Sequence, residues 1–252
     1  MFLIGDIGNT QSKFALYDSK KNKIKNLITA DSYSLEKNKL FTKLAYNGKI
    51  QCVVVTSVVP KVFLKIKKLF IRKNIKCLEL LDKKMKNPIK ININKPKQVG
   101  SDRISNVIAA HNFYNTNCIV VDFGTATTFD ILTKKKTYEG GLITPGVRLS
   151  LSTLNSLTAL LPLVKLKKTT KIIGKDTISA INSGIYWGYV SMINGILEKI
   201  ISSTRKKYKI ILTGGLSYIF SNSLKYKSTV AKNITLWGVV GIINFNKKLF
   251  KI

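Results

Sequence analysis

The amino-acid sequence predicts an α/β protein made of two similar halves. A short pattern occurs twice: an apolar strand ends in an Asp, a glycine-containing turn with hydroxyl and amide side chains follows, and a second apolar strand comes next. The two Asp residues, Asp6 and Asp122, lie 116 residues apart. Predicted strands and helices also alternate along the chain, as they do in α/β folds. We therefore expect one domain at residues 1–114 and a second at 115–252, each large enough for its own core.

The first half is predicted to begin with three strands and to end in a helix. The strands lie within residues 2–29, and the following elements are a helix at 35–46, a buried strand at 52–56, a helix near 62–70 and a strand at 77–81. Residues 83–99 are polar and contain two prolines, so we expect an irregular connection there. An apolar stripe at Ile104, Val107, Ile108 and His111 then predicts a helix with Ser101 or Asp102 at its N-cap.

The second half is predicted to repeat the three-stranded start and to continue with helices. Strands are expected at 118–122, 127–132 and about 137–143, followed by a glycine-rich bend and a helix near 147–158. A long helix fits 177–203, a strand 210–215 and a last helix 235–245. Gly184 and Gly188, four residues apart on the long helix, would allow another backbone to pack closely.

The chain carries a formal net charge of +31, from 43 basic and 12 acidic residues. This charge suggests a nucleic-acid partner, but 39 of the basic residues are Lys and only four are Arg, the residue that base and phosphate recognition favours. The lysines are scattered and are not interleaved with stacking aromatic residues. Lys, Ile and Asn, which have A/T-rich codons, exceed a third of the chain. We therefore attribute the charge to genome base composition and expect no nucleic-acid partner.

The cysteine pattern and the apolar runs predict a cytoplasmic protein that is not associated with a membrane. Cys52, Cys77 and Cys118 are odd in number, far apart and next to apolar runs, which is typical of reduced, buried thiols. The N-terminus lacks the basic segment of a signal peptide. No apolar run approaches the ~20 residues that cross a bilayer.

The repeated turn has the chemistry of a phosphate-binding loop. Glycine lets backbone N–H groups approach a phosphate, and Asn9, Thr10 and Thr125 add neutral donors. The Asp at the end of each strand is a hard oxygen ligand that suits Mg²⁺ carrying nucleotide phosphates. Either hairpin alone would fit an ordinary turn, whereas two copies in matching contexts favour phosphate binding.

The sparse acidic residues favour phosphoryl transfer with a carboxylate base. Asp6, Asp102 and Asp122 all lie at element ends beside glycine or hydroxyl residues, and the single histidine, His111, is expected to be structural. Phosphoryl transfer depends mainly on positioning, metal ions and dipoles, with an Asp accepting the hydroxyl proton. The P-loop motif and the G-x-G-x-x-G motif are both missing from the sequence. A duplicated hairpin of the actin, sugar-kinase and Hsp70 type remains, with Thr213-Gly214-Gly215 as the adenosine-side turn.

At the level of ordered motifs, the chain resembles the type III pantothenate kinases. The motifs are Asp6-Ile7-Gly8-Asn9-Thr10, Ser57-Val58-Val59-Pro60, Gly100-Ser101-Asp102-Arg103, Val121 to Thr128, Gly140 to Gly146, Gly174-Lys175-Asp176-Thr177 and Thr213-Gly214-Gly215. The resemblance implies two ribonuclease-H-like domains, an ATP cleft between them and a homodimer. It also implies transfer of the ATP γ-phosphate to pantothenate, the first step of coenzyme A synthesis.

The resemblance further implies a role for each matching residue. Asp102 would be the catalytic proton acceptor, and pantothenate would contact Gly100, Ser101, Asp102 and Arg103, with Thr177 reaching it across a dimer interface. Asp6 would orient Mg²⁺ or Mn²⁺ through the ATP phosphates, and Asp122 would bind a monovalent cation, K⁺ or NH₄⁺. The ATP-binding residues would be Asp6, Ile7, Gly8, Asn9, Thr10, Gln11, Ser12, Lys13 and Thr125.

Two departures and two alternatives accompany the resemblance. Ile93 stands where the family often has a Tyr beside pantothenate, and the usual Trp-Arg segment is not visible around residues 25–31. A non-catalytic regulator or nucleic-acid-binding relative of the same fold is one alternative. A kinase for another small acceptor, such as a sugar or acetate, is the other.

Overall fold

The computed structural model describes residues 1–46 and 50–252, and their contacts divide the chain into two units. Unit 1 contains residues 1–115, 135–138 and 233–252, and unit 2 contains residues 116–134 and 139–232. The sequence-based division placed the last 20 residues with the second half. The contacts place them in unit 1, where they form helices against the first sheet.

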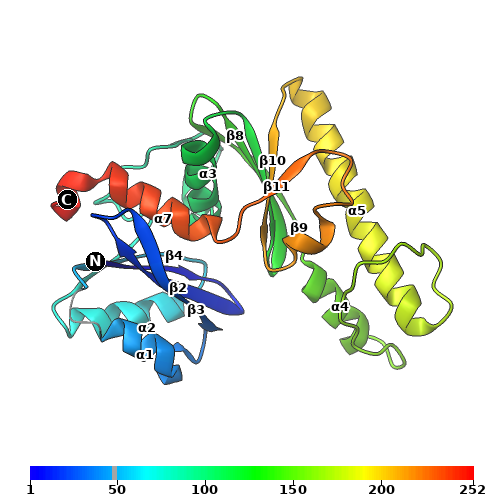
Figure 1. Ribbon diagram of the computed structural model, residues 1–252, viewed down its shortest axis with the longest axis horizontal. Helices are drawn as coiled ribbons and strands as arrows, with labels where there is room; N and C mark the ends of the chain where they lie inside the picture. The colour runs from blue at the N-terminus through cyan, green and yellow to red at the C-terminus, as the bar shows by residue number, and fades with distance from the viewer. Residues whose placement is uncertain (47–49) are drawn as a thin grey trace. The chain divides into compact units, whose positions relative to one another are not determined.

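Unit 1 is built on a five-stranded sheet with the order β3-β2-β1-β4-β5 (Figure 1). The strands are β1 (Phe2–Ile7), β2 (Gln11–Asp18), β3 (Lys23–Asp31), β4 (Cys52–Ser57) and β5 (Lys76–Glu79). β1 pairs with β2 in antiparallel fashion and with β4 in parallel fashion. The chain order and pairing therefore give a three-stranded meander followed by parallel strands.

Two helices cover one face of this sheet and form the core of unit 1. After a 3₁₀ turn η1 (Leu35–Lys37) come α1 (Lys39–Ala45) and α2 (Pro60–Ile71). Phe41 of α1 and Phe70 of α2 are at most 1% exposed, and they belong to the same cluster as Leu3 and Val53 from the strands. The buried face of α2, the helix expected near residues 62–70, is formed by Val62, Ile66 and Phe70.

The other face of the same sheet is covered by α3 (Ser101–Tyr114) and α7 (Ile234–Phe245), which pack against each other (Figure 1). The packing is so close that a Cβ built on Gly238 would overlap the Ser105 carbonyl oxygen. Ser105 Oγ donates to the Thr235 carbonyl at 2.6 Å, and Thr235 Oγ1 donates to Asn106 Oδ1 at 2.8 Å. α3 is therefore fixed to α7 by shape and by buried hydrogen bonds.

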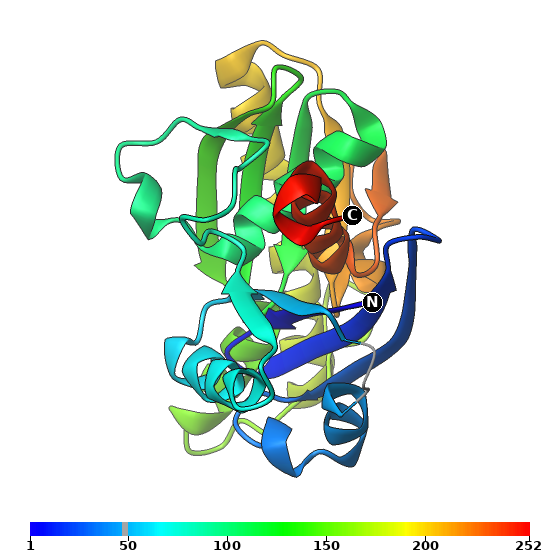
Figure 2. The ribbon, with the colours of Figure 1, turned by 90° about the vertical axis from the view of Figure 1, so that its left-hand side faces the viewer.

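The end of the chain is anchored on unit 1 next to its beginning (Figure 2). α8 (Lys247–Phe250) places the Phe250 ring edge-on against Phe2, with ring centroids 5.4 Å apart. Asn246 binds the segment after β5, accepting from the Lys86 N–H at 2.8 Å and donating to the Lys86 carbonyl at 2.9 Å. These contacts explain why residues 233–252 join unit 1.

Unit 2 repeats the strand order of unit 1, as β9-β8-β7-β10-β11. The strands are β7 (Cys118–Phe123), β8 (Ala126–Thr133), β9 (Thr137–Pro145), β10 (Lys209–Gly214) and β11 (Ser228–Val230). As in unit 1, the first strand is antiparallel to the second and parallel to the fourth. The first two residues of β9, which the contacts assign to unit 1, pair with β6 (Lys90–Ile91), a short strand in the segment expected to be irregular. The same segment also contains a 3₁₀ turn, η2 (Pro96–Gln98).

The core of unit 2 lies between its sheet and the long helix α5 (Thr177–Thr204). Ile193 and Leu197 of α5 are fully buried in one cluster with Val121 and Phe129 of the strands. α4 (Val147–Ser156) adds Val147 and Leu151 to this cluster, and α6 (Ser217–Phe220) adds Phe220. The two matching sheets confirm the α/β fold with two halves. Over the described residues, no helix is long and apolar enough to span a membrane.

Candidate functional site

Asp6 lies at the end of β1, where the phosphate-loop prediction places it. Its Oδ1 accepts a hydrogen bond from Thr56 Oγ1 at 2.9 Å, and the two residues are partners in the parallel β1–β4 ladder. Thr56 is fully buried, so it holds the carboxylate from the interior side. The pairing explains why Thr56, which sequence reasoning did not single out, belongs to the site.

The next residue of β4 connects this carboxylate to the start of α3. The Ser57 N–H donates to Ser101 Oγ at 3.0 Å, and Ser101 is only 4% exposed. The expectation that Ser101 or Asp102 caps the helix is wrong, because the N-cap is Gly100 and it makes no side-chain cap. Ser101 uses its hydroxyl to attach α3 to the end of β4, so Asp6 and Asp102 are linked within unit 1 through neighbouring hydroxyl residues.

Asp102 sits in the first turn of α3 in mostly buried surroundings. Burial raises the pKa of its carboxyl above the ordinary value, and the Arg103 N–H, which donates to Oδ1 at 2.8 Å, partly opposes that shift. A Cβ on Gly100 would lie 2.5 Å from Asp102 Oδ1, so the glycine leaves the space that the carboxylate occupies. This shift brings the pKa of the Asp102 carboxyl closer to the range in which a general base is efficient at neutral pH.

Arg103 is positioned by an aromatic ring at the start of β9. Its guanidinium carbon lies 5.9 Å from the ring centre of Tyr138, which is 1% exposed. A guanidinium at this distance gains from the ring quadrupole, and its planar fork matches a carboxylate. Arg103 is therefore suited to an anionic substrate, and Tyr138 is a supporting residue that sequence reasoning missed.

Glu79, at the end of β5, is a further, partly buried carboxyl near the start of α3. Burial raises the pKa of this carboxyl. Hydrogen bonds with Ser101 and with the Leu81 N–H partly oppose the shift, and the Leu81 nitrogen lies 2.8 Å from Oε2. Its Oε1 is buried and makes no hydrogen bond within residues 1–46 and 50–252. Sequence reasoning missed this residue, because Glu79 lies outside the repeated pattern.

The turn between β1 and β2 presents its middle residues to solvent. Asn9, Thr10 and Gln11 are exposed, Gly8 and Lys13 are half-buried, and Ile7 is buried. Ser12, predicted as an ATP-binding residue, is fully buried, and its hydroxyl oxygen lies 2.8 Å from the hydroxyl oxygen of Ser32. The turn thus offers exposed donors on one side and is anchored by serines on the other.

The second copy of the pattern forms a compact turn in unit 2. Asp122, at the end of β7, is paired with Thr128 and Thr213 on the neighbouring strands, and Thr125 is exposed in the turn itself. Gly214 has a φ of +86°, and a Cβ there would lie 2.6 Å from Asp122 Oδ1. The glycine therefore allows β10 to turn close to the carboxylate.

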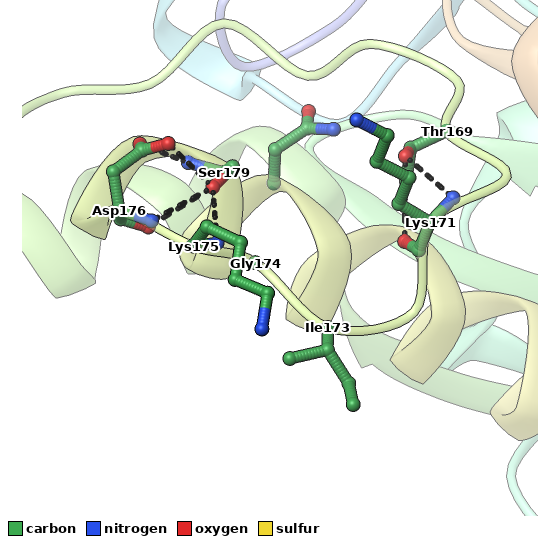
Figure 3. A pocket seen from close by; sticks show the side chains of 8 residues that line it. Thr169, Lys171, Ile173, Gly174, Lys175, Asp176 and Ser179 are labelled. Atoms are coloured by element: carbon green, nitrogen blue, oxygen red, sulfur yellow. Dashed lines mark hydrogen bonds between the residues drawn. The ribbon is translucent and has the colours of Figure 1, made fainter.

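Thr177 is the first residue of α5, and it is exposed. The helix begins with a capping box, in which Asp176 Oδ1 accepts from the Ser179 N–H at 2.9 Å (Figure 3). A small pocket of about 160 Å³ lies beside this helix start (Figure 3). It is lined by Thr169, Lys171, Ile173, Gly174, Lys175, Asp176, Ser179 and Asn182.

Other reactive side chains of the chain are structural. The three cysteines are free and buried, as the sequence predicted, and burial raises the pKa of Cys52 to about 11 and that of Cys77 to about 12. His111 is 8% exposed on α3, and burial, together with Lys136, lowers its pKa. Across the described part of the chain, His, Cys, Asp and Glu form no group of three that could hold a metal ion.

Solved structures with the same fold include kinases and proteins with other roles. A Campylobacter jejuni protein described as a Baf family transcriptional activator is 21% identical, with a TM-score of 0.64 and coverage of 98% of this chain and 99% of that one. A Sinorhizobium meliloti protein described as a 2-dehydro-3-deoxygalactonokinase is 10% identical, with a TM-score of 0.62 and full coverage of both chains. At these identities the likeness shows the fold alone.

The sequence comparisons are more specific than the structural ones. The profile of the family described as Type III pantothenate kinase matches residues 2–199. A type III pantothenate kinase of Pelagibacter ubique is 45% identical over 246 residues, which cover 95% of this chain and 97% of the relative. One from a Sulfurihydrogenibium species is 40% identical over 250 residues, covering 95% and 98%. The chain therefore belongs to the type III pantothenate kinase family.

Proposed function

We propose that this protein phosphorylates pantothenate at the expense of ATP, the first step of coenzyme A biosynthesis. Family membership supports the reaction, and one feature of the structure carries the assignment to this chain. A mostly buried carboxyl with a raised pKa, Asp102, stands at the start of α3 beside Arg103. This pair combines a proton acceptor with a partner for the substrate carboxylate.

In this proposal Asp102 accepts the proton of the primary hydroxyl of pantothenate as that oxygen bonds to the γ-phosphorus of ATP. The bond from the γ-phosphorus to the bridging oxygen breaks, and ADP leaves with its electron pair. Arg103 binds the pantothenate carboxylate, and Gly100 and Ser101 shape the same helix start. Thr177 is proposed to contact pantothenate from a second copy of the chain.

The turn after β1 is proposed to bind the ATP phosphates. Its exposed residues supply neutral donors, and the half-buried Lys13 supplies a positive charge. Thr125, in the matching turn of unit 2, is proposed to contact ATP as well. The ATP-binding set is Asp6, Ile7, Gly8, Asn9, Thr10, Gln11, Ser12, Lys13 and Thr125.

The donor chemistry fits a divalent ion that arrives with ATP. Mg²⁺ or Mn²⁺ is usually held by one or two carboxylates together with phosphate oxygens and water, and Asp6 is such a carboxylate. When bound, the ion would neutralise charge that develops on the phosphates. Asp122 is proposed to hold K⁺ or NH₄⁺ beside the second turn, where Gly214 allows close approach to its Oδ1.

The experiment that tests the function measures ADP release from the purified full-length chain with three acceptors. Release that depends on pantothenate, and not on a hexose or on acetate, is the expected result. ADP release with the sugar or with acetate, but not with pantothenate, would mean that the acceptor is not pantothenate. Salt-dependent binding to DNA or RNA without ADP release would favour a regulatory role instead.

We also propose that the chain works as a homodimer in the cytoplasm. Leu157, Leu160 and Leu163 are 77%, 90% and 68% exposed, and such apolar groups are typical of surfaces that a partner covers. A Cβ built on Gly184 or Gly188 of α5 would meet no atom of the described residues within 4 Å apart from the backbone of its own helix turns. A second copy is proposed to cover these three leucines. Sedimentation equilibrium is expected to give twice the chain mass, and a Leu160→Glu variant is expected to shift it to the monomer mass.

A further inference from the structure

The phosphate loop is anchored from behind by a residue outside the loop. Ser32 directly follows β3 and is 1% exposed. Its Oγ donates to the Gly8 carbonyl at 2.6 Å, and its backbone N–H donates to the Thr10 carbonyl at 3.2 Å. A single buried serine therefore holds two carbonyl groups of the turn.

Counting the protons fixes the direction of the neighbouring hydrogen bond. Ser12 Oγ and Ser32 Oγ are 2.8 Å apart, so one of the two hydroxyls donates to the other. The Ser32 hydroxyl has one proton, and the Gly8 carbonyl, which can only accept, receives it. Ser12 therefore donates to Ser32.

This direction matters for ATP, because phosphate oxygens are acceptors and need donors. The only hydroxyl proton of Ser12 points at Ser32, and Ser12 is fully buried. While the network holds, Ser12 has no hydroxyl proton to offer a phosphate. Its place in the ATP-binding set is then indirect.

The same network orients a backbone donor of the loop. The peptide group is planar and trans, so the Asn9 N–H points opposite to the Gly8 carbonyl. Since that carbonyl points at the buried Ser32, the Asn9 N–H points away from Ser32. Asn9 itself is exposed, so this amide is suited to a phosphate oxygen.

We propose that Ser32 is a positioning residue for the ATP phosphates, and that Ser12 acts through Ser32 rather than by touching the nucleotide. The proposal rests on the ATP-dependent activity proposed above. It adds a residue from the end of β3 to a site otherwise built from the first hairpin, and it separates the predicted ATP-binding residues into those that contact phosphate and one that supports the loop.

The test compares Ser32→Ala, Ser12→Ala and the double variant with wild type, using the full-length protein. Ser34→Ala is the matched control, because Ser34 is exposed and its hydroxyl donates to Asp31 Oδ1 rather than to the loop. Two measurements are made: KM values for ATP and pantothenate, and the Kd for Mg-ADP by calorimetry, which needs no turnover.

For Ser32→Ala, the KM for ATP and the Kd for Mg-ADP are expected to rise about tenfold, the scale of one buried hydrogen bond. The KM for pantothenate should change less than about twofold, which a general loss of structure would not produce. Ser12→Ala keeps the bond from Ser32 to Gly8 and should raise the ATP KM by no more than about threefold. The double variant should match Ser32→Ala, and Ser34→Ala should match wild type.

Three outcomes would overturn the proposal. One is a Ser32→Ala protein with wild-type nucleotide affinity. Another is a Ser12→Ala protein that loses as much affinity as Ser32→Ala, with additive losses in the double variant, which would make Ser12 a direct contact. The third is a Ser32→Ala protein in which the KM for pantothenate rises as much as the KM for ATP. If Ser32→Ala does not fold, Ser12→Ala alone still decides between direct contact and support. If wild type binds Mg-ADP but does not phosphorylate pantothenate, the proposed function fails while the affinity comparison still tests Ser32.

Discussion

The contact between α3 and α7 allows a stability prediction to be worked out from the structure. Gly238→Ala would place a methyl group on the Ser105 carbonyl oxygen, so the two helices must move apart. Overpacking of this kind costs roughly 1–3 kcal/mol. The same contact holds the Ser105–Thr235 and Thr235–Asn106 hydrogen bonds, at 2.6 and 2.8 Å, each contributing about 1 kcal/mol.

The expected net loss of stability for Gly238→Ala is the sum of these effects minus a gain in helix propensity. Alanine favours a helix over glycine by about 1 kcal/mol, which leaves a net destabilisation of roughly 2–4 kcal/mol. For a protein of this size, 1 kcal/mol shifts Tm by about 2–4 °C, so Tm should fall by roughly 5–15 °C. Because α3 carries Asp102, kcat for pantothenate should fall as well.

The assay is thermal unfolding followed by circular dichroism, with Gly195→Ala as the matched control. Gly195 is also helical, but a Cβ built there would meet no atom in the described ranges within 4 Å apart from the backbone of its own helix turns. Its replacement should leave Tm unchanged or raise it slightly. A Gly238→Ala protein that melts together with Gly195→Ala would refute the reasoning about the α3–α7 contact.

Three further predictions concern carboxyl groups. Asp102→Asn should lower kcat by roughly 10²–10⁴. It should also raise Tm at pH 7.5 but not near pH 4. The pKa of Asp102 is raised in the folded state, so wild type loses stability as the pH rises above the ordinary pKa of 3.8. A variant that retains most of the wild-type rate would remove Asp102 from the base role. Because burial raises the pKa of Glu79 as well, Glu79→Gln should have a higher Tm than wild type at pH 7.5, and the difference should vanish near pH 4. A lower Tm at pH 7.5 would contradict the effect of burial on Glu79. Activity should require K⁺ or NH₄⁺, and equal rates in a sodium-only buffer would count against the role of Asp122.

The sequence predicted the elements of the fold because their signals are local. Continuous apolar runs define β1 and β7, and in each strand the Asp is the next-to-last residue, where its carboxylate interrupts the buried run. The long helix α5 begins at Thr177, as expected, because Asp176 and Ser179 form a capping box within four residues. Such patterns can be read without knowing the neighbours.

Features that depend on distant partners could not be predicted in this way. Ser101 looks like a helix cap in sequence, but its hydroxyl bonds to Ser57, 44 positions earlier. α7 is buried on most of its surface and therefore shows no polar face to reveal which unit it packs against. Glu79 and Ser32 join the site only because β5 and β3 end near its loops.

Three of the residues that support the site in unit 1 are neutral hydroxyls, and this choice has an electrostatic reason. Thr56 holds Asp6, Ser101 attaches α3, and Ser32 holds the Gly8 carbonyl. A hydroxyl fixes direction through a hydrogen bond but adds no charge. A lysine in the same positions would lower the pKa of Asp102 and weaken it as a base, and a carboxylate would repel the ATP phosphates. In a chain with 39 lysines, neutral support therefore leaves the charges at the site to the groups that meet the substrates.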